Sequence, residues 1–300
     1  MIKYFFIIIV ITTNVFASDV INFTFLGTGT PRPDIDKLGP SILIKNGDQE
    51  ILLDAGRGTS IRLNQIGNDF LKVNRVFISH LHYDHIIGLP DFWLTSNLWQ
   101  KKDNMNIYGP KGIKKFCQNI INSYTEDINY RYEKNNYSKL KCHSFDTLPL
   151  GVKSGRITIN FFKNSHGHIE ESYGFKIKFN NKTVVYSGDT SYSQNVIDAA
   201  KNCDILIHEV IASSKKIYDD NTKLRKVFET HTNINQLIKI LNITNPKLTI
   251  LNHALLFDIS ESEVLNKIKK EYNGDIIFSK DLMSVDLGKE ISVFDIIKYN

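Results

Sequence analysis

The chain has 300 residues and a formal net charge of +5, with its Lys and Arg residues spread along the sequence rather than massed in blocks. A hydrophobic content of 42% and a charged content of 23% are ordinary for a soluble globular protein. A chain of this length can bury a large core without needing disulfides to stabilise it. No basic block of the kind that binds nucleic acid stands out, and pairs such as Lys101-Lys102 and Lys215-Lys216 resemble solvated surface.

The first residues resemble a targeting signal. Lys3 precedes the apolar run Tyr4–Ile11, and Val15-Phe16-Ala17 follows after a polar stretch. A basic start, a short apolar run and an Ala cleavage site are typical of a secretory signal peptide, and the run is too short to anchor in a bilayer. We expect a signal peptide at residues 1–17, a periplasmic or secreted mature protein, and no membrane anchor after cleavage; a buried first strand is the alternative.

In chain order, short apolar strands alternate with helical segments. In the first half we predict strands at 21–26, 41–44, 50–53, 73–79 and 105–108, helices at 57–66, 89–98 and 113–124, and irregular structure at 125–138. From 140 to 186 the pattern is mainly β, with strands at 157–162, 173–179 and 183–186. Beyond it we predict helices at 193–200, 234–241 and 262–272, strands at 205–208 and 248–251, and further short strands in the tail.

Two β-rich halves, each followed by helices, predict two sheets with helices outside them. The chain contains no linker rich in Pro, Gly or Ser, no repeat and no low-complexity tract, so we expect residues 18–300 to form one domain. Its three cysteines, Cys117, Cys142 and Cys203, are an odd and widely spaced set. They allow one disulfide in an oxidising compartment or three buried inert thiols, and we assign none to a metal.

The strand at 73–79 leads directly into His80-Leu81-His82-Tyr83-Asp84-His85. Imidazole nitrogens and carboxylate oxygens are ligands of Zn²⁺ and related divalent ions. His80 and His82 project to one side of an extended backbone and can hold one ion, while Asp84 and His85 lie past the turn and can hold a second. Two ions need more ligands, and His166, Asp189 and His253 each follow or end a predicted strand.

These motifs resemble those of the metallo-β-lactamase superfamily, over nearly all of the mature chain. The resemblance rests on the HxHxDH run and on further segments at residues 26–31, 39–41, 52–58, 187–190, 208–210 and 230–232. Within the superfamily the chain is most similar to the ribonuclease Z and arylsulfatase-like branch. The resemblance implies a four-layer αββα sandwich, an α/β fold with two metal ions at one edge. Zn²⁺ is the default ion, and Mn²⁺ or Fe would use similar ligands.

Carried over position by position, the resemblance implies a role for each site residue. One metal is bound by His80, His82 and His166, the other by Asp84, His85 and His253, and Asp189 bridges the two. Asp54 matches a buried Asp that steadies the metal loop. His231 matches a proton donor to the leaving group and Glu209 the residue that orients it, so the catalytic set is Asp84, His231 and Glu209. His168 is the alternative third ligand; the spacing to Tyr173-Gly174-Phe175 favours His166.

The expected reaction is metal-dependent hydrolysis of an ester-type bond in an arylsulfate, a phosphodiester or a similar small substrate, with a metal-bound hydroxide as the nucleophile. Two alternatives compete with it: a ribonuclease Z-type enzyme that trims transfer RNA, and a lactonase or a non-catalytic metal-binding relative. Ribonuclease Z resembles a clamp with a long arm between the residues equivalent to His166 and Asp189, and here that interval is short. We therefore expect a small-molecule substrate, no nucleic-acid partner, and a homodimer as one option for assembly.

Overall fold

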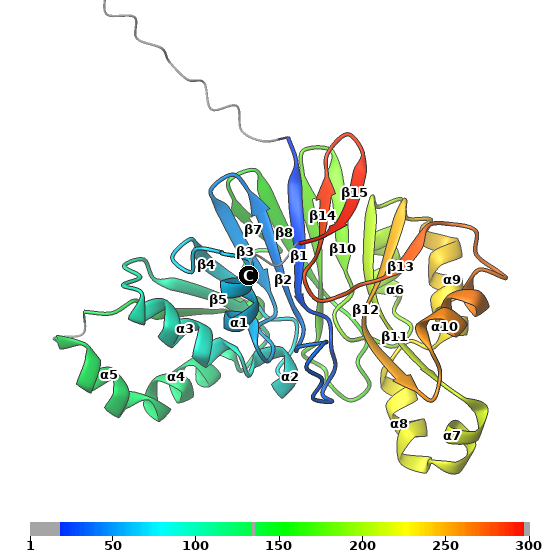
Figure 1. Ribbon diagram of the computed structural model, residues 1–300, viewed down its shortest axis with the longest axis horizontal. Helices are drawn as coiled ribbons and strands as arrows, with labels where there is room; N and C mark the ends of the chain where they lie inside the picture. Colours follow the sequence, from blue (N-terminus) through cyan, green and yellow to red (C-terminus); the bar gives the residue numbers. More distant parts are fainter. Residues whose placement is uncertain (1–18, 134–135, 297–300) are drawn as a thin grey trace, which may run out of the picture.

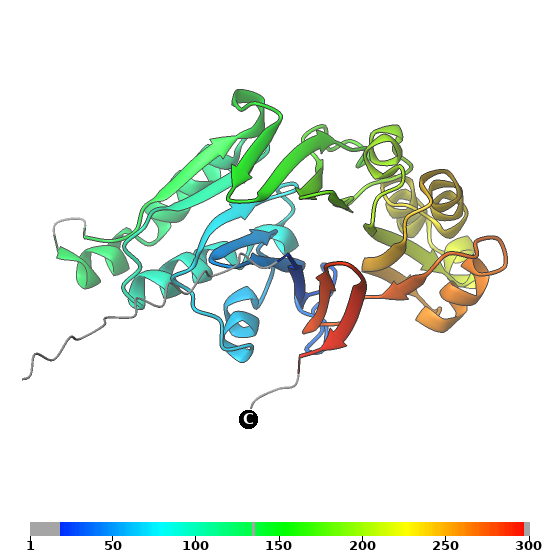
Figure 2. The ribbon, with the colours of Figure 1, turned by 90° about the horizontal axis from the view of Figure 1, so that it is seen from above.

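The computed structural model of the protein describes residues 19–133 and 136–296, so the expected signal peptide lies outside the described residues. Two β-sheets are stacked in the middle of the molecule, with helices on both outer faces (Figures 1 and 2). This arrangement confirms the expected αββα class. Within the described residues, no helix is both long and apolar enough to cross a bilayer.

The first sheet has eight strands in the order β15-β14-β1-β2-β3-β4-β5-β6. Their bounds are β1 (Ile21–Gly27), β2 (Ser41–Asn46), β3 (Gln49–Leu53), β4 (Val73–Phe77), β5 (Met105–Gly109), β6 (Leu140–Ser144), β14 (Met283–Leu287) and β15 (Ile291–Asp295). Strands β3 to β6 run parallel, so the loops that follow them open at the same edge of the sheet.

The second sheet has seven strands in the order β13-β12-β11-β10-β9-β8-β7. Their bounds are β7 (Gly151–Ser154), β8 (Ile157–Lys163), β9 (Tyr173–Phe179), β10 (Lys182–Tyr186), β11 (Ile205–Ser213), β12 (Leu248–Phe257) and β13 (Ile276–Phe278). Strands β10 to β13 are parallel, and their carboxyl ends therefore share one edge as well.

The helices divide between the two outer faces. Those of the first half are α1 (Thr59–Gln65), α2 (Tyr83–Ile86), α3 (Leu89–Leu98), α4 (Ile113–Ser123) and α5 (Thr125–Arg131). Those of the second half are α6 (Gln194–Ala200), α7 (Lys215–Asp220), α8 (Thr222–Thr230), α9 (Ile234–Thr244) and α10 (Glu261–Ile268). Figure 1 shows α3 to α5 on the opposite side of the sheets from α9 and α10, with α7 and α8 projecting below the second sheet.

The core between the sheets is built by strand alternation. Along β8 the side chains of Ile157, Ile159 and Phe161 are buried between the layers, and those between them are partly exposed. On the outer face, α4 buries Ile113, Cys117 and Ile120, which lie four and three residues apart on one side of the helix. Removing this apolar surface from water stabilises both interfaces.

Two segments depart from the sequence prediction. Residues 125–138 were expected to be irregular, but α5 occupies the first half of that segment, so this prediction is wrong there. The segment is polar, so the sequence did not indicate a helix there. The helix buries Ile128, and Asp127 pairs with Arg131 one turn later at 2.7 Å. Helices α7 and α8 were also not predicted; charged and polar residues predominate in both, α7 buries no side chain and α8 buries Leu224.

Strands β11 and β12 run well beyond the predicted ends at 208 and 251. Polar residues at His208-Glu209 and Asn252-His253 interrupt the apolar pattern, although the two strands continue to pair after a register shift between His208 and Val210. The ladder of backbone hydrogen bonds, which the sequence pattern does not reveal, carries both strands through these polar positions.

A disulfide joins Cys117 on α4 to Cys142 on β6, while Cys203 is a free, buried thiol. The bond holds α4 to the edge strand of the first sheet. Disulfides persist in oxidising compartments, which agrees with the expected export, and export itself stays a prediction.

We predict that removing this bond lowers the free energy of unfolding. Closing a loop over a separation of 25 residues restricts the unfolded chain by about 3 kcal/mol, so Cys117→Ser lowers the denaturation midpoint. Denaturant titration with and without dithiothreitol measures the effect, and a Cys117→Ser/Cys142→Ser double variant should be insensitive to reduction. Three titratable thiols in the unreduced, denatured protein would show that the bond does not form.

Candidate metal centre

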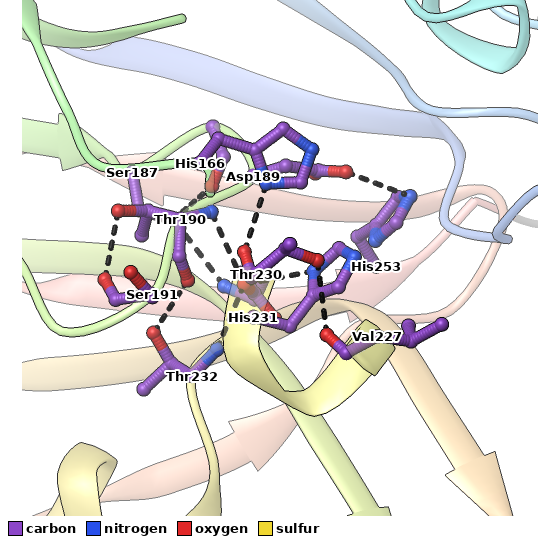
Figure 3. Close-up of polar contacts among 12 residues, drawn as sticks. His166, Ser187, Asp189, Thr190, Ser191, Val227, Thr230, His231, Thr232 and His253 are labelled. Atoms are coloured by element: carbon purple, nitrogen blue, oxygen red, sulfur yellow. Dashed lines mark hydrogen bonds and ion pairs between the residues drawn. The ribbon is translucent and has the colours of Figure 1, made fainter. Parts of the chain in front are cut away.

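The residues predicted to bind metal meet where the loops at the ends of both sheets converge. They come from the segment between β4 and α3, from the β8–β9 loop, from the loop after β10 and from the middle of β12. Figure 3 shows His166, Asp189, His231 and His253 directed toward a common region, although they are far apart in the sequence. Parallel strands deliver this convergence, because their carboxyl ends lie at one edge.

The first group of candidate ligands is His80, His82, His166 and Asp189, with one ligand atom of each within 4.8 Å of all the others. His80 Nε2 lies 2.9 Å from His82 Nδ1, and His166 Nε2 lies 3.3 Å from the same nitrogen. His80 and His166 are buried and His82 is exposed, so this group opens to solvent on one side.

The second group is Asp84, His85 and His253, all buried. His253 Nε2 lies 3.2 Å from Asp84 Oδ2. Asp189 lies between the groups, because its Oδ2 is 3.4 Å from His85 Nε2, 3.5 Å from His253 Nε2 and 3.8 Å from His80 Nε2. This position is the one that a bridging carboxylate needs.

The residues fit a pair of divalent cations. His85 Nε2 and Asp189 Oδ1 are buried without a hydrogen-bond partner in the part of the chain that the structure describes. Leaving such atoms unpaired costs about 1–3 kcal/mol each, and a coordinated ion removes that cost. Nitrogen and oxygen donors in groups of three or four match the ligand preference of Zn²⁺ and related ions.

Hydrogen bonds on the far side of the histidine rings turn the correct nitrogen toward the centre. His166 Nδ1 donates to the carbonyl oxygen of Thr230 at 2.8 Å, and His85 Nδ1 donates to Asp54 Oδ2 at 2.9 Å. Because a carbonyl or carboxylate oxygen only accepts, each Nδ1 carries the proton and each Nε2 keeps its lone pair for a metal.

Asp54 holds the metal loop in place, the task that the sequence predicted for it. Its carboxylate is fully buried and accepts hydrogen bonds from the Ser79 amide (2.7 Å) and hydroxyl (3.0 Å), from His85, and from the Tyr186 hydroxyl (2.9 Å). Ser79 Oγ in turn accepts from His80 Nδ1 at 3.1 Å, so one carboxylate orients two candidate ligands.

The glycine of the Asp54-Ala55-Gly56 motif permits close packing beneath this loop. A Cβ at Gly56 would lie 2.6 Å from the backbone oxygen of Asp84, a separation that side chains do not tolerate. Asp54 itself has a φ of 56°, and His253 has a φ of 49°, in the left-handed region that non-glycine residues rarely enter. Such strained positions cluster at functional sites.

Burial and neighbouring charges shift the titration of the ligand set. Burial, followed by the positive charge of His85, lowers the pKa of His80 well below its usual value. Burial alone would raise the pKa of Asp189, but the charges of His253 and His85 outweigh it and hold that pKa well below its usual range. Both shifts favour the neutral imidazole and the ionised carboxylate that coordinate metals.

His231 and Glu209 form a buried pair beside the two groups. His231 Nδ1 donates to Glu209 Oε1 at 3.1 Å, and the same oxygen accepts from the amides of Thr190 and Thr232. Burial would lower the pKa of His231, but the charge and the hydrogen bond of Glu209 raise it to about 9. The His231 ring lies 5.0 Å from that of His166, centroid to centroid, at the boundary of the candidate centre.

The structure separates the two histidines that the sequence left as alternatives. His166 belongs to the first group, whereas His168 is exposed and belongs to neither. Three supporting residues were not predicted: Ser79, Tyr186 and Thr230. The first two directly precede motifs that the sequence analysis used, but nothing in the sequence indicates what their hydroxyl groups contact.

We predict that His166→Ala lowers the bound metal from two ions toward one, because the first group loses a nitrogen donor. His168→Ala, two residues away and exposed, is the matched control and should retain two ions. Elemental analysis of the purified variants measures the stoichiometry. A full complement of metal in His166→Ala together with a loss in His168→Ala would reverse the assignment.

We predict that Asp54→Asn weakens metal binding by about 10-fold to 100-fold, since it removes the acceptor that orients His85 and Ser79. Competition with a chelator measures the affinity, and Asp198→Asn, an exposed carboxylate on α6, is the control. An unchanged affinity in Asp54→Asn would contradict the supporting role of this residue.

The chain is similar to proteins of one superfamily. A ribonuclease Z from Mycobacterium bovis (strain BCG / Pasteur 1173P2) is 26% identical over 277 residues, which cover 89% of this chain and 99% of the relative. The metallo-beta-lactamase fold protein YhfI from Bacillus subtilis superposes with a TM-score of 0.71 at 21% identity, covering 90% of this chain and 100% of that one. Human tRNase Z, short form, gives a TM-score of 0.64 at 20% identity, with coverages of 88% and 98%.

These findings support a metal-dependent hydrolase of the ribonuclease Z branch, and they correct one expectation. The prediction of a small-molecule substrate with no nucleic-acid partner is wrong, because a relative that spans 89% of the chain is a ribonuclease. The β9–β10 hairpin occupies the interval between His166 and Asp189, where a long arm was expected to be absent. The argument from charge had considered only how Lys and Arg are distributed along the sequence. Helices α7 and α8, which directly precede His231 in the chain, carry five cations: Lys215, Lys216, Lys223, Arg225 and Lys226.

A family model described as "Anti-Pycsar protein Apyc1" matches residues 21–253, which is more than half of the chain and includes every candidate ligand. The matched region begins at β1 and ends at His253, the last residue of the second group. The chain therefore belongs to the Anti-Pycsar protein Apyc1 family, within the metallo-β-lactamase superfamily.

Proposed function

We propose that this protein hydrolyses phosphodiester bonds in RNA with a dinuclear metal centre. The observation that carries the proposal is the buried His231–Glu209 pair at the boundary of the two ligand groups. The similarity to ribonuclease Z over 89% of the chain supports the same class of substrate.

The chain's own residues would hold the two ions, with Asp189 between the groups. When bound, two divalent ions make water a stronger nucleophile at neutral pH and stabilise charge on the attacked phosphate. We propose Zn²⁺ as the ion, because the donor set is rich in imidazole, and Mn²⁺ or Fe as the alternatives.

His231 would donate a proton to the oxygen that leaves. Cleavage of RNA expels an alkoxide, which is a strong base and needs that proton, whereas an aryl sulfate expels a phenolate that needs it far less. Glu209 fixes the ring so that the other nitrogen, Nε2, faces away from the carboxylate. An acid placed in this way favours a phosphodiester with a poor leaving group over the arylsulfate that the sequence analysis named first.

The similarity to ribonuclease Z over 89% of the chain favours a phosphodiester over the remaining alternatives. Opening a lactone or a β-lactam also expels a group that needs a proton, so the His231–Glu209 pair alone does not distinguish these reactions from phosphodiester cleavage. A non-catalytic relative would have no requirement for that pair. A lactone and a β-lactam serve as comparison substrates in the functional test.

We predict that the mature, metal-loaded protein cleaves phosphodiesters in preference to the other substrates. The panel contains precursor transfer RNA, a ribodinucleotide, a nucleoside 3′,5′-cyclic phosphate, bis-p-nitrophenyl phosphate, an aryl sulfate, a lactone and a β-lactam. Removing the metal with a chelator should abolish turnover, and adding Zn²⁺ should restore it. Faster hydrolysis of the aryl sulfate than of every phosphodiester would overturn the proposal.

The acid role has its own measurement. Loss of a positioned proton donor costs about 10²-fold to 10⁴-fold, so His231→Ala should lower kcat by that factor for the ribodinucleotide, whose leaving group is an alkoxide. For bis-p-nitrophenyl phosphate, whose leaving group is stable without a proton, the decrease should be much smaller. Equal decreases for both substrates would show that His231 does not act as the acid, and unchanged metal content is the control for an intact centre.

A further inference from the structure

A cavity of about 400 Å³ lies between the loop after β1, the end of α8 and the second half of β12. We call it the β12 pocket. Apolar residues such as Val227, Leu256 and Phe257 form much of its wall, and the loop after β1 adds the charged residues Arg32, Asp34 and Lys37. None of them belongs to the candidate metal centre.

The β12 pocket adjoins the metal centre through the backbone. Ala254 directly follows the candidate ligand His253. The carbonyl oxygen of Val227 accepts a hydrogen bond from Thr230 Oγ1 at 2.9 Å, one residue before His231. Figure 3 shows Val227 near His231 and His253, so residues that line the β12 pocket lie next to the candidate site.

The arginine at the rim presents a flat cationic surface. The guanidinium carbon of Arg32 lies 4.1 Å from the centre of the Phe257 ring, and one of its nitrogens lies 3.5 Å from the carbonyl oxygen of Leu256. Phe257 is partly buried and Arg32 is exposed, so one face of the guanidinium covers the ring and the other faces outward. Unpaired bases stack on arginine planes and aromatic rings.

The loop that carries Arg32 is anchored rather than free. Asp281 accepts hydrogen bonds from the amide (2.9 Å) and hydroxyl (2.8 Å) of Thr28 and from the amide of Leu38 (2.8 Å). It also pairs with Arg62 at 2.9 Å in a buried salt bridge. Both ends of the segment from Thr28 to Leu38 are therefore fixed, and Tyr83 donates to the oxygen of Pro31 between them.

The spacing also fits a nucleotide. Phe257 follows Ala254 by three strand residues, which corresponds to about 10 Å along β12. An arginine plane at that separation from the metal edge reaches a base whose own phosphate lies at the centre.

We propose that the β12 pocket binds the nucleobase next to the scissile phosphate, stacked on the outer face of the Arg32 guanidinium, which Phe257 holds in place. The inference rests on the proposed function and specifies a ribonucleotide as the group on one side of the bond. Arg32 is a specificity residue, because it contacts the substrate away from the reacting atoms.

The test is the binding of adenosine 5′-monophosphate and of ribose 5-phosphate, its counterpart without a base, to the metal-loaded protein by calorimetry. Stacking contributes about 1–3 kcal/mol per base, so the wild type should bind the nucleotide about tenfold more tightly than the sugar phosphate. Arg32→Ala and Arg32→Lys should both abolish that difference, because lysine keeps the charge and loses the plane. Phe257→Leu should reduce it.

Arg131→Ala, an exposed arginine on α5 far from the pocket, is the matched control and should retain the tenfold difference. With a ribodinucleotide as substrate, Arg32→Ala should raise KM more than it lowers kcat. Equal affinity of the wild type for both ligands, or wild-type behaviour of Arg32→Lys, would overturn the inference. Base-dependent binding without cleavage of any phosphodiester would instead refute the proposed function and leave the β12 pocket assignment standing.

Discussion

The candidate site depends on the buried carboxylate of Asp54. It accepts four hydrogen bonds, two from Ser79 at the end of β4, one from His85 on α2 and one from Tyr186 at the end of β10. The first sheet and the second sheet thereby meet at one charged group. A buried carboxylate is costly unless such donors surround it, so the donors and the carboxylate require one another. The rings of His80 and His85 receive their orientation from the same network.

The arrangement of the candidate metal ligands also depends on that network. Two groups of imidazole and carboxylate atoms lie on either side of Asp189, with unpaired buried atoms directed inward. Burial favours the neutral imidazole of His80, and the neighbouring charges favour the ionised carboxylate of Asp189; these are the protonation states that bind metal. The strained backbone at Asp54 and His253 is tolerated because the surrounding strands and hydrogen bonds determine it.

The segments around the candidate metal centre shape the space that a substrate would occupy. Helix α8 ends at Thr230, whose carbonyl oxygen orients His166, and the next residue is His231. One short segment therefore links a metal ligand, the proposed acid and the cationic surface of α7 and α8. The loop after β1, Val227 of α8 and the second half of β12 form the β12 pocket next to this segment. A phosphodiester with a base on one side matches both features.

The sequence by itself indicated the positions of most strands and, with the family resemblance, the candidate ligands that the structure brings together, because alternating apolar residues and a dense HxHxDH run are local patterns. Residues 21–26, 89–98 and 173–179 were recognisable in this way. It did not reveal α5, α7 and α8, because polar and charged residues predominate in these helices and few of their side chains are buried. It also ended β11 and β12 early, because the paired ladder carries both strands through polar positions. It also misjudged the nucleic-acid question. Only the fold decided which hydroxyl groups reach Asp54 and that His166, which the sequence already favoured over His168, belongs to a ligand group, since each depends on distances between residues far apart in the chain.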